Sequence, residues 1–207
     1  DPTPVHPVAL TLAAKDPSEN VVYIARPCQY VADEACHHED WTGARFSEEA
    51  VASINAAIDQ HEQRARAASV ELVGFSGGGA IALLLAQRRD DVTLIVTVAG
   101  DLDPAALNRY HRVSPLRGSL DPMREALKIA GIPQWHFTGS RDTLVPAFVA
   151  ENFRKASGSP QNIRLEVING VSHMEGWAGR WGVISSSISA SRGSWPSPHR
   201  SASPRTP

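Results

Sequence analysis

A glycine-flanked serine constrains the fold of this chain more than any other feature. The segment Gly74-Phe75-Ser76-Gly77-Gly78 has the form G-x-S-x-G; it follows the apolar run Val70-Glu71-Leu72-Val73 and precedes a helical run at residues 80–86. This order predicts a strand, a sharp turn and a helix, and the turn needs glycines because its backbone is strained and closely packed. Such a turn lifts the serine hydroxyl clear of the sheet, at a helix N-terminus. The match alone also fits an ordinary turn serine or a Gly-rich phosphate-binding turn.

An acid and a histidine follow this serine along the chain. Asp142 lies in the turn after one predicted strand, and His173 lies in the loop after another. Each has a simpler interpretation, since Asp142 could cap the helix that follows and His173 could be a surface histidine. Asp101 and Asp103, which follow an earlier strand, are the alternative acids. The order serine, acid, histidine and the position of all three at strand ends favour a catalytic triad with Asp142 as the acid.

The three residue types are those that covalent hydrolysis requires. A serine hydroxyl is a poor nucleophile until a base removes its proton, which neutral histidine can do near pH 7. The acid fixes the histidine tautomer and stabilises the imidazolium. We therefore expect Ser76 as the nucleophile, His173 as the base and Asp142 as its orienting acid. The amide of Gly77, directly after the nucleophile, is the expected oxyanion-hole donor.

Six stretches of the chain carry a family pattern, from about residue 4 to residue 181. They are Val22-Tyr23-Ile24-Ala25-Arg26-Pro27-Cys28-Gln29-Tyr30, Trp41-Thr42-Gly43-Ala44-Arg45-Phe46, residues 74–79, Thr97-Val98-Ala99-Gly100-Asp101-Leu102-Asp103, Val113-Ser114-Pro115-Leu116 and Ser172-His173-Met174-Glu175-Gly176-Trp177. On these stretches the chain resembles the α/β-hydrolase superfamily, and within it a little-characterised group of bacterial, lipoprotein-like hydrolases. The resemblance implies the α/β class, as a three-layer α/β/α sandwich with a mostly parallel sheet.

Hydrophobic periodicity predicts alternating helices and strands, the pattern of a parallel sheet covered on both faces. Helices are expected at residues 7–14, 47–67, 78–89 and 147–156, with Ser47 as an N-cap. Strands are expected at residues 21–25, 70–74, 92–99, 134–138 and 163–168. Residues 26–45 form a long loop, and residues 101–131 form a polar excursion with short helices, a candidate lid or pocket wall.

Both ends depart from the family pattern. The strand at residues 21–25 would be the fourth of the fold, so we expect the earlier strands, and the loop that supplies a second oxyanion donor, to be missing from a processed or truncated chain. Losing one such donor typically costs about 100- to 1000-fold in rate. Residues 182–207 are rich in Ser, Pro and Arg. We expect them to be a disordered tail after a partial hydrolase domain at residues 1–181.

Composition narrows the choice of partners. The 207 residues are 42% hydrophobic and 20% charged, as in an ordinary globular domain. A net charge of −2 gives no reason to expect nucleic acid, and no run approaches the roughly 20 apolar residues of a membrane span. We expect a small-molecule ester as the partner and no cofactor. The oligomeric state stays open.

Cys28 and Cys36, the only cysteines, lie in one loop. A disulfide between them would suit a periplasmic or exported protein, whereas two reduced thiols would suit a cytoplasmic one. The neighbouring run Cys36-His37-His38-Glu39-Asp40 contains metal-ligand types, but adjacent ligands converge poorly on one ion and no second cluster has the right spacing. A solvated polar loop, with no metal, is the preferred interpretation.

Two function classes remain. The first is a serine hydrolase that cleaves an ester, or alternatively a thioester or amide, through an acyl-enzyme. A carboxylesterase is favoured over a peptidase because cleavage of an ester requires the least catalytic assistance from an incomplete site. The second is a non-catalytic α/β-hydrolase-like protein that lacks a complete oxyanion hole. The sequence does not fix the substrate.

Overall fold

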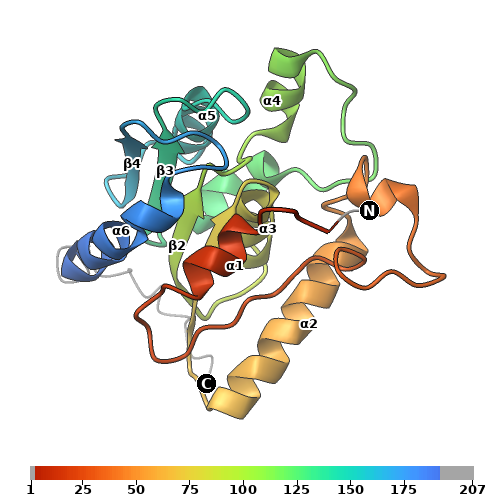
Figure 1. Cartoon of the computed structure of the whole chain (residues 1–207), viewed down its shortest axis with the longest axis horizontal. Helices are drawn as coiled ribbons and strands as arrows, with labels where there is room; N and C mark the ends of the chain where they lie inside the picture. Colours follow the sequence, from red (N-terminus) through yellow and green to blue (C-terminus); the bar gives the residue numbers. More distant parts are fainter. Residues whose placement is uncertain (1–2, 192–207) are drawn as a thin grey trace, which may run out of the picture.

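A parallel sheet of four strands, in the order β1-β2-β3-β4, forms the middle layer of the fold. The structure is a computed structural model, and it describes residues 3–191 (Figure 1). The strands are β1 (Val70–Phe75), β2 (Val92–Val98), β3 (Gln134–Gly139) and β4 (Ile163–Ile168). The helices are α1 (Val8–Ala13), α2 (Glu48–Ala65), α3 (Gly77–Ala86), α4 (Pro104–His111), α5 (Phe148–Ala156) and α6 (Trp177–Ser191), with short 3₁₀ helices η1 (His38–Trp41) and η2 (Pro122–Ile129).

The side chains of β2 show how the two helical layers divide. Leu94, Val96 and Val98 pack into one hydrophobic cluster with residues of α1 and α6. Ile95 points to the opposite face and joins the other cluster, with residues of α2, α3, η2 and α5. Because successive side chains of a strand point to opposite faces, the nearly continuous apolar run of β2 feeds both cores. The predicted three-layer α/β/α sandwich is confirmed.

Helix α2 illustrates how local sequence signals determine where a helix begins and which face it buries. Its N-cap is Ser47, whose side chain accepts a hydrogen bond from the amide of Ala50 at 3.2 Å. Val51, Ile54 and Ile58 lie on one face and are buried, at the spacing of an amphipathic helix. The predicted helix and its cap are confirmed.

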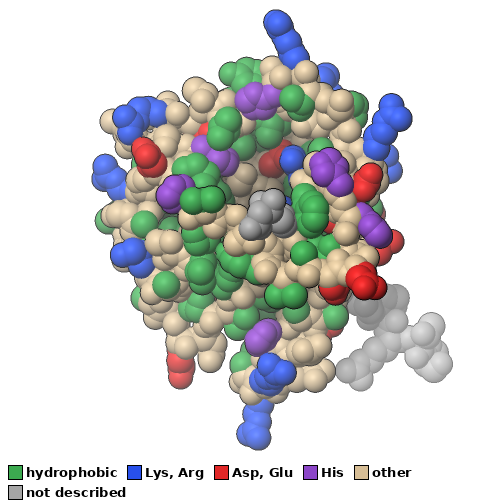
Figure 2. Space-filling model, turned by 45° about the vertical axis from the view of Figure 1, so that its right-hand side comes forward, with side chains coloured by type: hydrophobic (Ala, Val, Ile, Leu, Met, Phe, Trp, Pro, Cys, Tyr) green, Lys and Arg blue, Asp and Glu red, His purple; other side chains and the backbone are tan. Residues whose placement is uncertain are grey.

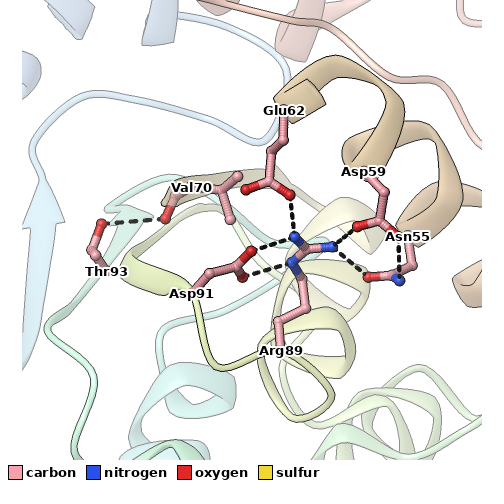
Figure 3. A network of polar contacts seen from close by, with 7 residues as sticks. All are labelled: Asn55, Asp59, Glu62, Val70, Arg89, Asp91 and Thr93. Carbon is pink, nitrogen blue, oxygen red and sulfur yellow. Dashed lines mark hydrogen bonds and ion pairs between the residues drawn. The ribbon is translucent and has the colours of Figure 1, made fainter. Parts of the chain in front are cut away.

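A cluster of charges around Arg89 joins α2 to the turn between α3 and β2 (Figure 3). The guanidinium of Arg89 pairs with Asp59 and Glu62 of α2 and with Asp91, and it also donates to Asn55. The Arg89 side chain is only 7% exposed. Hydrogen bonding to Asp91 raises the pKa of Arg89 further. This network therefore fixes α2 against the sheet by charge as well as by apolar packing.

The strand predicted at residues 21–25 is wrong. These residues form neither helix nor strand, and no sheet partner lies beside them among the described residues. Val21 and Val22 are 41% and 48% exposed, so the run is not a buried strand. β-branched residues favour extended backbone, but a strand forms only where a neighbour supplies hydrogen bonds. The sheet of the described residues accordingly begins with β1, the strand before the turn at Ser76.

The tail predicted from residue 182 is also wrong over its first part. Helix α6 runs from Trp177 to Ser191, and Trp177, Trp181, Ile184 and Ile188 are buried along it. Packing of these apolar side chains against the sheet stabilises the helix in spite of its serines, of which Ser185 and Ser186 both donate to the carbonyl of Gly182. The remainder of the predicted tail, residues 192–207, lies outside the described residues.

The long loop at residues 26–45 is tied by a disulfide between Cys28 and Cys36, whose Cα atoms are 5.7 Å apart. Of the two alternatives for these cysteines, the structure has the disulfide. The Trp41 indole donates to the carbonyl of Cys28 at 2.8 Å, so the loop folds back upon itself. His37 and Asp40, once candidate metal ligands, instead cap η1. Within the described residues, no helix is long and apolar enough to cross a membrane.

Candidate active site

Ser76 occupies a tight turn between β1 and α3. Its backbone has φ 51° and ψ −122°, a positive φ that a non-glycine residue adopts only at an energetic cost. Gly74 is required here, because a Cβ at this position would lie 2.2 Å from the carbonyl oxygen of Gly78. A Cβ on Gly77 would be 3.2 Å from the ring of Phe46. The glycines thus let the strand and helix approach closely while Ser76 takes the strained position.

The three sequence-predicted residues lie in a row, with His173 within hydrogen-bond distance of both Ser76 and Asp142. His173 Nε2 is 3.0 Å from Ser76 Oγ, and His173 Nδ1 is 2.9 Å from Asp142 Oδ2. Each residue follows the carboxyl end of a different strand, namely β1, β3 or β4. Parallel strands end at one edge of the sheet, which brings residues far apart in the sequence together.

Other contacts hold this row of hydrogen bonds in place. Asp142 Oδ1 accepts the amides of Leu144 and Val145 at 2.9 and 2.8 Å, which leaves Oδ2 for the histidine. Asp142 therefore caps the turn that follows β3 and, through its other oxygen, also orients His173. The indole of Trp177 donates to the carbonyl of His173 at 3.0 Å. With Nδ1 donating to a carboxylate, Nε2 is left as an acceptor for the serine hydroxyl.

The two alternative acids are engaged elsewhere. Asp101 pairs with Arg45 at 3.1 Å, and burial raises the pKa of Asp101 to about 6 although Arg45 opposes the shift. Asp103 caps α4 through the amide of Ala106 and accepts a hydrogen bond from Asn152, each at 2.9 Å. The histidine is thus bonded by Asp142 rather than by either alternative.

The expected oxyanion donor, Gly77, is the first residue of α3 and lines a pocket beside Ser76. The first amides of a helix have no acceptor within the helix, so this position suits an anionic oxygen. A second donor is harder to assign. The amide of Arg26 donates to Gln29 Oε1, and the amide of Gln29 donates to the carbonyl of Arg26, both at 3.2 Å. Because both amides already donate hydrogen bonds within the loop, neither is assigned as the second oxyanion donor.

The pocket has a volume of about 400 Å³, and Ser76 and His173 both line it. Sequence reasoning missed several of its other lining residues, which are Arg26, Trp41, Arg45, Asn108 and His111. The last two belong to α4, within the excursion at residues 101–131 that was predicted as a lid or wall. Figure 2 shows one face of the molecule, where acidic, basic and histidine side chains gather around a hollow. The only signal for the loop residues was the family resemblance of the stretches that contain Arg26 and Arg45.

Three solved structures are similar to this chain in the arrangement of their helices and strands. An α/β hydrolase enzyme from the metagenome of sediments from the lagoon of Mar Chica, Morocco, aligns with a TM-score of 0.52 at 17% identity, over 68% of this chain and 68% of its own. An esterase of Pyrococcus furiosus aligns with a TM-score of 0.57 at 15% identity, over 72% of this chain and 63% of its own. An α-β serine hydrolase homologue from Coxiella burnetii aligns with a TM-score of 0.52 at 19% identity, over 83% of this chain and 66% of its own.

No family model matches the chain, and no curated protein matches it. The aligned regions span 63% to 68% of the lengths of the three structures. Identities of 15% to 19% mean that the likeness lies in the arrangement of the chain and not in its sequence. The parallel sheet, the turn before α3 and these structural neighbours together identify the fold: the described part of this chain has the fold of the α/β-hydrolase superfamily.

Proposed function

We propose that the protein is a serine hydrolase that cleaves a carboxylic ester through an acyl-enzyme. The observation that carries the proposal is the unbroken row of hydrogen bonds from Ser76 through His173 to Asp142, beside a pocket. Ser76 is the nucleophile, His173 the general base, Asp142 its orienting partner and Gly77 an oxyanion donor. Hydrogen bonds of this kind make an otherwise weak hydroxyl nucleophilic.

The reaction proceeds in two halves. His173 Nε2 takes the proton of Ser76 as the oxygen attacks the ester carbonyl, and the amide of Gly77 stabilises the resulting oxyanion. The imidazolium, stabilised by the Asp142 carboxylate, then gives the proton to the departing alcohol, leaving an acyl-serine. Water attacks this ester in the second half and loses a proton to His173. The imidazolium then returns the proton to Ser76 Oγ as the acyl–oxygen bond breaks, which releases the carboxylic acid and restores the free serine.

Esters are the favoured substrates for two reasons. An alkoxide is a better leaving group than an amine, so an ester makes the smaller demand on a site where only one oxyanion donor is assigned. One structural neighbour is an esterase. Thioesters and amides are the other bonds that the same mechanism could cleave. The Cys28–Cys36 bond supports a periplasmic or exported location, because disulfides persist in oxidising compartments.

A fluorophosphonate probe tests the proposal, since it forms a covalent adduct only with an activated serine. We expect labelling of the wild-type protein, with the adduct mapped to Ser76 by peptide mass spectrometry, and none with Ser76→Ala. Ser186→Ala is the matched control, because Ser186 is an exposed serine of α6 remote from the pocket. Absence of labelling in folded wild-type protein would favour the second candidate, a non-catalytic α/β-hydrolase-like protein, which the unassigned second oxyanion donor supports.

A further inference from the structure

The wall of the pocket beside Ser76 carries more positive than negative charge. Among residues 3–191, its charged lining residues are two arginines, Arg26 and Arg45, and one carboxylate, Asp101. We propose that the preferred substrate is a small ester that carries a carboxylate of its own, and that Arg26 binds this carboxylate. The inference rests on the proposed hydrolase function, because it names the substrate class for the same site.

The two arginines differ in their partners. Arg45 Nη2 lies 3.1 Å from Asp101 Oδ2, so its charge is compensated within the protein. Arg26 donates through Nη1 to the carbonyl of Arg45 at 3.2 Å, a neutral acceptor. No carboxylate among residues 3–191 forms an ion pair with Arg26. The charge of Arg26 is therefore not compensated by an ion pair within residues 3–191, and Arg26 can bind an external anion.

The position of Arg26 is unfavourable without such an anion. Burial lowers the pKa of Arg26, and the nearby charge of Arg45 lowers it further. A cation removed from water and placed near a second cation is destabilising unless an opposite charge compensates for it. A bound carboxylate would offset both effects, and the planar guanidinium suits it because it can donate two parallel hydrogen bonds.

The Arg45–Asp101 pair is also incompletely satisfied. Arg45 Nε and Asp101 Oδ1 are buried, and neither has a hydrogen-bond partner among the described residues. Buried polar atoms without partners are uncommon and each needs an explanation. Both atoms are buried and Asp101 Oδ1 is an acceptor, so neither would bond a substrate carboxylate directly, and recognition of that group rests on Arg26.

Arg26 is held in place before any ligand arrives. The backbone of residues 26–29 forms a turn closed by the hydrogen bond from the amide of Gln29 to the carbonyl of Arg26. Cys28, within this turn, is bonded to Cys36, and its carbonyl accepts the Trp41 indole. A preorganised side chain loses less entropy on binding, which favours a role in recognition.

The test compares two esters that differ by one group. 4-Nitrophenyl butyrate ends in a methyl group where 4-nitrophenyl hemisuccinate ends in a carboxylate, and both acyl chains are short enough for a pocket of about 400 Å³. The readout is the ratio of kcat/KM for hemisuccinate to that for butyrate. We expect a ratio above one for the wild type and a ratio about 10- to 100-fold lower for Arg26→Gln, as a charge-assisted hydrogen bond predicts.

Three further variants separate recognition from folding. Arg124→Gln is the matched control, since Arg124 is an exposed arginine of η2, and its ratio should equal that of the wild type. Arg26→Lys keeps the charge and should retain part of the preference. Asp101→Asn removes the one carboxylate that the described part of the chain contributes to the wall, and it should raise the ratio, the opposite direction to Arg26→Gln.

A wild-type ratio at or below one, or equal ratios for Arg26→Gln and Arg124→Gln, would overturn the proposal. Calorimetric titration with succinate distinguishes this failure from failure of the hydrolase function, because it needs no turnover. If neither ester is cleaved but succinate binds the wild type at least tenfold more tightly than Arg26→Gln, the anion site stands and the hydrolase function does not. If succinate binding is equal in both proteins, the anion site is absent.

Discussion

The two oxygens of the Asp142 carboxylate accept hydrogen bonds from different groups. An asparagine side chain at this position has only one oxygen and cannot accept both sets of bonds. One oxygen accepts two backbone amides, and the other faces the Nδ1 of His173. In Asp142→Asn an NH₂ group would replace one of these oxygens, so the favoured histidine tautomer would be lost. We expect kcat for 4-nitrophenyl butyrate to fall about 10,000-fold, as for the equivalent change in serine proteases. A comparable loss in Asp103→Asn would show that the wrong acid had been assigned.

Buried His136 makes the stability of the protein dependent on pH. Its ring lies between Thr97, at 2.8 Å, and Gln134, at 3.1 Å, and burial lowers the pKa of His136 to about 3. The unfolded chain binds a proton near pH 6.5, so the unfolded state gains protons first as the pH falls. Between about pH 6.5 and pH 3, this residue should lower the free energy of unfolding by up to about 1.4 kcal/mol per pH unit.

Urea unfolding at pH 7 and pH 5 measures this effect. The buried carboxylate of Asp101 acts in the opposite direction, because its pKa is raised on folding and its protonation below about pH 6 favours the folded state. The informative quantity is therefore the difference between the wild type and His136→Gln. We expect the wild type to lose more stability than the variant on acidification; an equal loss would show that His136 is protonated in the folded protein.

The residues of the site were predictable to different degrees. The proximity of Ser76, Asp142 and His173 could be predicted from sequence because each lies in the loop after a recognisable strand, and parallel strands end at one edge. Arg26 and Arg45 could not be assigned. They lie in a loop whose path depends on a disulfide and on contacts such as that of Arg45 with Asp101, and these leave no local periodicity in the sequence.

At the scale of elements, Arg89 and Arg88 offer a matched pair of adjacent arginines. Arg89 is 7% exposed and joins three carboxylates, whereas Arg88 is 31% exposed and pairs with Glu48, itself 62% exposed. Arg89→Gln should destabilise the protein by about 2 kcal/mol, because it leaves the carboxylates of Glu62 and Asp91, which are 15% and 25% exposed, uncompensated and close together.

The neighbouring change Arg88→Gln should cost less than about 1 kcal/mol, as for an exposed ion pair. Urea denaturation of both variants measures the contrast. Equal losses would mean that the network of Figure 3 is no stronger than a surface salt bridge.

The elements that sequence predicts well are those whose signals are local. Helix α2 has its cap and amphipathic face, and β2 is a continuous apolar run. Residues 21–25 have strand-forming side chains as well, but strand formation depends on a hydrogen-bonding neighbour that composition does not reveal. For α6 the error has the opposite cause, because its serines suggested disorder while Ile184 and Ile188 continue a buried stripe.

At the scale of the whole molecule, the disulfide links stability to specificity. Arg26 lies just before Cys28, at one end of the loop that the Cys28–Cys36 bond closes. Replacing both cysteines with serine should lower the free energy of unfolding by about 2–3 kcal/mol in the chain-entropy model of a short loop. It should also lower the ratio of hemisuccinate to butyrate turnover, since Arg26 would be less well ordered. Thermal unfolding and the two-ester assay measure these effects, and an unchanged ratio would show that the bond does not position Arg26.

The two ends of the described chain meet on one face of the sheet. Val8 and Leu12 of α1 share a hydrophobic cluster with Trp177 and Trp181 of α6, and the Trp181 indole donates to Asp16 Oδ2 at 3.1 Å. Through its own indole, Trp177 holds the carbonyl of His173.

A ribosome makes a chain from its N-terminus, so α1 and the strands that it packs against emerge before α6, which completes their shared cluster. The serine turn leaves the ribosome long before the histidine is fixed in place. Since the Trp177 indole bonds the carbonyl of His173, we expect the hydrogen bond between His173 and Ser76 to form only after α6 has been made and has packed.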